Sequence, residues 1–194
     1  MLQPTNSVLL AGLADPANAA VWSEFDGRFR PLLVAFAGRL RFGSTDADEL
    51  AQRVLVRFAE EYRAGRYERG RGRLRSWLFG IARMCAAEQR REQARFRAAR
   101  GESALDALPA ESDAEPFFEQ EWRRAMVRAA FAELRATTRS DERTVRVVEL
   151  LALEQRPVEE AAATLGMSVG AVYTAKHRGL ARLRTILERL EDEA

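Results

Sequence analysis

The sequence predicts an all-α protein with two small helical domains, joined by a flexible acidic linker, the C-terminal one containing a helix-turn-helix. Three observations lead to this prediction. Apolar residues recur at intervals of three and four in almost every periodic stretch of the 194 residues. Glycine and proline fall between these stretches, and charge is gathered in blocks of opposite sign. We therefore place the N-terminal domain at residues 1–100, the acidic linker at 101–115 and the C-terminal domain at 116–194.

The N-terminal domain is predicted to contain three long helices. Asp15, which precedes a proline, is a suitable cap for the first, and Gly43 is expected to close it. The second begins among the capping residues that start at Ser44. Its apolar stripe comprises Leu50, Val54, Leu55 and Phe58. A glycine-rich loop at residues 64–72 separates it from a third helix over about residues 73–97.

Arginine dominates the segment from Tyr62 to Arg100, which holds twelve arginines and three glutamates. Seven acidic residues and no Lys or Arg follow between Gly101 and Trp122. A basic block that glycine and tryptophan interrupt indicates a surface for a polyanion. Arginines that merely coat exposed helix faces are the alternative. We also expect the acidic segment to fold back onto the arginine face in the free protein and lower its affinity for DNA.

The stretch from Pro157 to Arg184 has the pattern of a helix-turn-helix, with an ordinary helical hairpin as the alternative. Pro157 fits the first turn of one helix, which should end at Leu165. Gly166 suits a turn with positive φ, and Ser168 suits the cap of the next helix.

The second of these helices is predicted to be two-faced. The residues expected to face inward are Val172, Gly179, Leu180, Leu183, Leu187 and Leu190. Thr174, His177 and Arg178 then lie on the opposite face, in the half of the helix that reads base edges in a major groove. Ser168 and Arg182 should lie near phosphates.

One Cys and one His exclude a disulfide framework and a Cys/His zinc site within one chain. These two residues also offer no pair of nucleophile and base. We therefore expect that the protein is not an enzyme and that it binds no metal and no cofactor. Cys85 and Trp77 share the helical register of apolar core residues and are expected in the core, with a redox-sensing thiol as the alternative for Cys85. No apolar run approaches the ~20 residues of a membrane span, so the expected location is the cytoplasm.

Three stretches resemble the extracytoplasmic-function group of the sigma-70 superfamily, the sigma factors of bacterial RNA polymerase. Asp46–Val54 resembles the helix that binds the polymerase clamp. Leu74–Arg83, followed by Arg90 and Arg91, resembles the segment that melts and reads the −10 promoter element. Ala162–Arg184 resembles the domain that reads the −35 element.

The resemblance implies three sets of contacts on this sequence. The set for core polymerase is Asp48, Glu49, Leu50, Gln52 and Arg53. The set for the −10 element and strand opening is Arg69, Arg71, Arg73, Arg75, Arg83, Arg90 and Arg91. The set for the −35 element is Ser168, Ala171, Tyr173, Thr174, His177, Arg178 and Arg182. Arginine planes beside a glycine-rich loop also suit unstacked bases on physical grounds.

A promoter-specificity subunit is therefore the function that the sequence favours. Its implied partners are core RNA polymerase, through the clamp coiled coil and the flap, and promoter DNA. An anti-sigma factor or another regulator is a further expected partner. The alternative is a stand-alone helix-turn-helix regulator whose N-terminal part is an interaction module.

Overall fold

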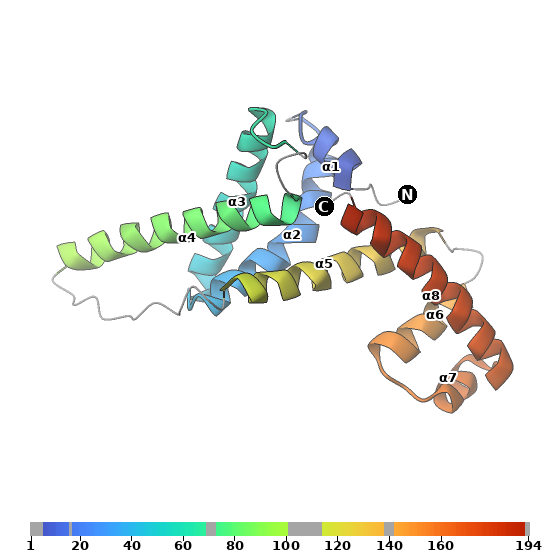
Figure 1. Cartoon of the computed structure of the whole chain (residues 1–194). Coiled ribbons are helices and arrows are strands. Elements are labelled where there is room, and N and C mark those ends of the chain that lie inside the picture. The colour runs from blue at the N-terminus through green and yellow to red at the C-terminus, as the bar shows by residue number, and fades with distance from the viewer. Residues whose placement is uncertain (1–5, 16, 69–72, 101–113, 138–141, 193–194) are drawn as a thin grey trace. The chain divides into compact units, whose positions relative to one another are not determined.

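The computed structural model describes residues 6–15, 17–68, 73–100, 114–137 and 142–192. Every regular element in these ranges is helical, which confirms the predicted all-α class (Figure 1). Two compact units divide the chain, one with residues 6–125 and the other with residues 126–193. No described helix is long and apolar enough to cross a bilayer.

In the described part of residues 6–125, this unit contains four helices and the first half of a fifth. These are α1 (Asn6–Gly12), α2 (Ala19–Arg39), α3 (Ser44–Arg63), α4 (Leu74–Ala99) and the start of α5 (Ala114–Thr137). Its core is rich in phenylalanine because the apolar faces of α2 and α3 meet there. Phe25 stacks on Phe58 at 4.9 Å and tilts against Phe29 at 4.9 Å between ring centroids, and all three are fully buried.

The boundaries of α2 differ from the sequence prediction. Asn18, not Asp15, caps the helix, because its side-chain oxygen accepts a hydrogen bond from the backbone N–H of Val21 at 3.2 Å. The helix ends at Arg39, and Arg41 takes the left-handed conformation with φ of 64°. Gly43 instead precedes α3 as its N-cap residue, so one connection holds both the end of α2 and the start of α3.

The other unit contains the end of α5 and the helix-turn-helix. Its further elements are α6 (Glu142–Val148), the π-helix η3 (Glu149–Leu153), α7 (Val158–Leu165) and α8 (Val169–Asp192). The predicted turn is confirmed, since Gly166 has φ of 61° and ψ of 38°. Ser168 accepts a hydrogen bond from the backbone N–H of Ala171 at 3.2 Å, as a cap should. Pro157 lies one position before α7, as its N-cap residue.

The inward face of α8 follows the prediction except at Leu180 and at Leu187, which is only half-buried. Val172 and Leu190 are 0% and 1% exposed, whereas Leu180 is 37% exposed. Ala175 and Ile186 are buried in addition. At Gly179 the backbone of α8 lies close against α6, because a Cβ there would lie 2.3 Å from a methyl group of Val148.

The boundary between the units lies inside α5, later than the predicted start of the C-terminal domain at residue 116. Phe118 and Trp122 are 1% and 3% exposed because they pack on aromatic residues of the first unit. Hydrophobic burial therefore assigns residues 114–125 to the first unit. Most of the predicted linker, residues 101–113, lies outside the described residues.

Candidate nucleic-acid and polymerase interfaces

The first half of α8 presents the predicted −35 contacts on one exposed face. Thr174, His177 and Arg178 are exposed, and their spacing of three and four residues puts them on the same side of the helix. The Thr174 hydroxyl donates a hydrogen bond to the backbone carbonyl of Gly170 at 3.0 Å, which orients its oxygen. The other members of the set, Ser168, Ala171, Tyr173 and Arg182, are also exposed.

The predicted −10 arginines along α4 fall into two groups, those that are exposed and those that contact other parts of the protein. Arg73 and Arg91 are exposed, and 18 residues, or five helical turns, separate them, so they share one side of α4 about 27 Å apart. Arg83 is also exposed, about a quarter turn around the helix from them, and its guanidinium lies 5.8 Å from the centre of the Phe79 ring. Arg69 and Arg71 lie outside the described residues.

Two members of this set are engaged with the protein itself. Arg90 donates a hydrogen bond to the backbone carbonyl of Leu40 and stacks over the ring of Phe42, 5.1 Å from its centroid. Burial lowers the pKa of Arg90. It holds the end of α2 against α4, which helical periodicity could not reveal. Arg75 forms an ion pair with Glu119 of α5 at 2.5 Å.

The sequence did not predict the contact of Tyr67, in the glycine-rich loop, with Trp77 of α4. Tyr67 stacks on Trp77 with 4.8 Å between ring centroids, and Trp77 also meets Phe58, with 4.8 Å between the centroids. Trp77 is half-buried, so it is only partly the core residue that its register predicted. The signal that could have found Tyr67 is its position within the loop, as an aromatic residue between Gly65 and Gly70, from where its ring can cover the start of α4.

The predicted polymerase contacts lie on α3, with one correction. Asp48, Glu49 and Gln52 are exposed, but Leu50 is 1% exposed and belongs to the core. Arg53 forms ion pairs with Glu49 at 2.9 Å and Glu92 at 2.8 Å, which raises the pKa of Arg53 and lowers that of Glu92.

A groove of about 610 Å³ follows this side of the unit. Its lining includes Gln52, Arg53, Val56 and Arg57 of α3, and Cys85 and Glu88 of α4. Val56 is 39% exposed, and Arg57 forms an ion pair with Glu88 at 2.7 Å. The groove thus combines an apolar side chain with paired charges, a surface suited to a partner helix of mixed character.

Cys85 is 2% exposed, and burial raises the pKa of its thiol, against the opposing effect of Arg57. A higher pKa leaves less of the reactive thiolate at neutral pH. We expect a chromogenic disulfide reagent to modify the native protein at least tenfold more slowly than the protein in 6 M urea. Equal rates would contradict the core assignment and favour the redox-sensing alternative.

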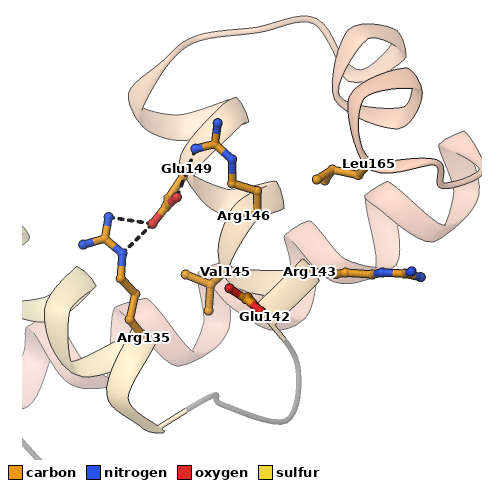
Figure 2. A pocket seen from close by; sticks show the side chains of 7 residues that line it. All are labelled: Arg135, Glu142, Arg143, Val145, Arg146, Glu149 and Leu165. Carbon is orange, nitrogen blue, oxygen red and sulfur yellow. Dashed lines mark hydrogen bonds and ion pairs between the residues drawn. The ribbon is translucent and has the colours of Figure 1, made fainter.

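The second unit has a pocket of about 550 Å³ that the sequence did not predict (Figure 2). Val145 and Leu165 provide its apolar part. Arg135 and Arg146 reach Glu149 from either side, at 2.6 and 3.1 Å, and this contact is the main reason that the pKa of Arg146 is raised. Arg143 also lines the pocket. Glu142 and Glu149 line it too, so charges of both signs surround the apolar part, and this combination fits an amphipathic helix that carries charged residues.

Comparison with known proteins finds a separate match for each of the two units. Residues 26–96 match the family model of sigma-70 region 2, and residues 141–183 match that of sigma-70 region 4. The chain is 26% identical over 195 residues to the ECF RNA polymerase sigma factor SigE of Mycolicibacterium smegmatis (strain ATCC 700084 / mc(2)155). That alignment covers 98% of this chain and 71% of the relative. No solved structure matches the chain significantly.

Proposed function

The chain belongs to the extracytoplasmic-function group of the sigma-70 family, whose members are promoter-recognition subunits of RNA polymerase, and we propose which surfaces make each contact. Its partners are accordingly core RNA polymerase and promoter DNA. The observation that carries this function is the presence of regions 2 and 4 in one chain, each on its own compact unit. We expect it to act in the cytoplasm, where the polymerase works.

The upstream contact is proposed for the first half of α8. Thr174, His177 and Arg178 would reach base edges in the major groove, because an exposed helix face of this width fits there. Ser168 and Arg182 would contact phosphates at the two ends of this face. Ala171 and Tyr173 would pack beside them against the groove wall.

The downstream contact is proposed for the exposed side of α4 and the loop before it. Arg73, Arg83 and Arg91 would follow the backbone of the opened strand, together with Arg69 and Arg71 of the loop. Tyr67, whose ring stacks on Trp77, adds an aromatic side chain on which an unstacked base can lie. Arg90 is left out of this set because its guanidinium is bound to Leu40.

Two polymerase contacts are proposed. The groove beside Glu49, Gln52 and Arg53 would receive the clamp coiled coil, since its exposed Val56 and paired charges suit a helical partner. The pocket around Val145 and Leu165 would receive the flap, because its apolar side chains and the surrounding charges suit an amphipathic helix. We propose an anti-sigma factor or another regulator as a further partner only because the chain belongs to this family.

Reconstitution with core RNA polymerase tests the function. The purified chain is mixed with core enzyme, the complex is isolated by size exclusion, and fragmented genomic DNA is supplied as template. We expect new transcripts whose start sites share an upstream and a downstream motif. Binding to promoter duplex without core enzyme, and no transcripts with it, would instead favour the stand-alone regulator.

The two DNA contacts should separate by mutation. Arg178→Ala is expected to weaken binding to the upstream motif by about 1–3 kcal/mol and to relax its sequence preference, because a base-directed contact is lost. Arg73→Ala with Arg91→Ala should leave upstream binding intact and impair strand opening, since both side chains lie on the α4 face. The measurement is permanganate reactivity of promoter thymines with the reconstituted polymerase.

A template with a pre-opened bubble provides the control. It should rescue the Arg73/Arg91 double variant, which is defective only in opening, and should not rescue Arg178→Ala. Equal failure of both variants on duplex and bubble templates would contradict the proposed division.

A further inference from the structure

We infer that residues 114–125 of α5, the docked segment, form an intramolecular cover that holds Arg75 in the free protein and must leave when the −10 strand binds. This inference rests on the proposed role of α4 in strand opening. Two kinds of contact support it, and both lie within the unit of residues 6–125.

The docked segment is anchored by aromatic residues. The Phe118 ring meets Phe36 edge-on at 5.5 Å and Phe79 at 5.0 Å. The Trp122 ring stacks on Phe29 at 5.3 Å. These are ordinary geometries for aromatic pairs, so the seat is complementary in shape and not merely apolar.

Charged residues complete the seat on both sides of the aromatic anchor. Glu119 forms an ion pair with Arg75 at 2.5 Å, with side chains 27% and 29% exposed. The Arg39 guanidinium lies over the ring of Phe117, 6.0 Å from its centroid. One pair joins α5 to α4 and the other joins α5 to α2, so the segment is held across both helices.

Glu119 places its carboxylate against the guanidinium of Arg75, the group that we propose binds a phosphate of the opened strand. A carboxylate and a phosphate both accept charge-assisted hydrogen bonds from a guanidinium. A phosphate that approached Arg75 would meet the negative charge of the Glu119 carboxylate, which already takes up hydrogen-bond donors of the guanidinium, so the carboxylate opposes binding of the DNA backbone there. Phe118 adds a steric barrier, because it covers Phe79, over which Arg83 also lies.

Release of the segment would uncover Phe29, Phe36 and Phe79, which are at most 9% exposed in this structure. Exposing that much aromatic surface to water is unfavourable. The cover should therefore stay closed in the free protein and open only when another surface takes its place. The proposed function makes core polymerase the partner that would take its place. Binding of the chain to core polymerase would then be coupled to exposure of Arg75 and the neighbouring −10 contacts on α4.

The first test uses the free protein and a 12-nucleotide single-stranded DNA of mixed sequence. Glu119→Gln should bind this probe about fivefold more tightly than wild type, a change of about 1 kcal/mol, because Arg75 is released. Glu115→Gln is the matched control, since Glu115 is an exposed acid on the same helix and the variant loses the same charge. If the two variants bound the single-stranded DNA with equal affinity, the proposed competition between Glu119 and DNA for Arg75 would be overturned.

The second test locks the cover. Arg39→Cys and Phe117→Cys are joined by a short bismaleimide whose spacer contains a disulfide, and core polymerase is then added. Trp22→Cys with Arg63→Cys is the matched lock, because Arg63 lies over the Trp22 ring at 5.6 Å in the same unit, away from α5.

The lock on α5 should lower strand opening at least tenfold, and reduction of the spacer should restore it, whereas the control lock should leave opening unchanged. Full opening by the locked protein would overturn the inference. Failure of wild type and of both reduced proteins to initiate would instead refute the proposed function, so the two failures are distinguishable.

Discussion

Replacing Glu49, Gln52 and Arg53 together by Ala is expected to abolish binding to core RNA polymerase while the fold survives. The three side chains line the groove on α3, and removing them takes away its charged and hydrogen-bonding rim. The ion pairs that are lost, from Arg53 to Glu49 and Glu92, are partly exposed and contribute little to stability. The measurement is co-elution of the variant with core enzyme, with helical content checked by circular dichroism.

The matched control is the triple variant Glu115→Ala, Gln120→Ala and Arg123→Ala. It removes the same three residue types from exposed positions of α5 in the same unit. It should bind core enzyme like wild type. Undiminished binding by the variant on α3 would mean that the clamp contact lies elsewhere.

Gly179→Ala is expected to destabilise the helix-turn-helix unit by about 1–3 kcal/mol, the usual cost of overpacking a core. The added Cβ would lie 2.3 Å from Val148 Cγ2 and 3.1 Å from Thr144 Cγ2. Val148 is fully buried and branched at Cβ, so it cannot turn away without disturbing α6. The clash outweighs the gain of about 1 kcal/mol that Ala normally brings to a helix.

Gly170→Ala on the same helix is the control, and its expected effect on the free energy of unfolding has the opposite sign. Nothing lies within 4 Å of a Cβ at this position, so the substitution should stabilise the unit by about 0.5–1 kcal/mol. Urea unfolding followed by circular dichroism reports both units. All three tryptophans precede residue 126, so their fluorescence reports the other unit alone and should be the same in both variants. A shift of the fluorescence transition in Gly179→Ala would contradict a local effect.

Features governed by neighbouring residues could be predicted from the sequence. The turn at Gly166 and the cap at Ser168 follow from backbone conformation and a hydrogen bond across three residues. The face of Thr174, His177 and Arg178 follows from helical periodicity.

Features governed by distant contacts could not be predicted. Arg90 and Arg91 are adjacent arginines of the same helix, yet only Arg90 meets the end of α2. Composition placed the domain boundary where the chain becomes acidic, but Phe118 and Trp122 find their partners more than 35 residues earlier in the sequence. Such pairings depend on how the helices pack, which periodicity along one helix does not record.

The position of the boundary within α5 has a consequence for building hybrid proteins. An exchange of C-terminal halves between two sigma factors would ordinarily join them before α5, at the acidic stretch. A hybrid joined there would inherit a foreign helix that must fill the seat of Phe118 and Trp122, and a poor fit would leave aromatic surface open to aggregation. A junction after residue 125 keeps residues 114–125 of α5 together with the helices on which they pack. It should therefore give the more soluble hybrid.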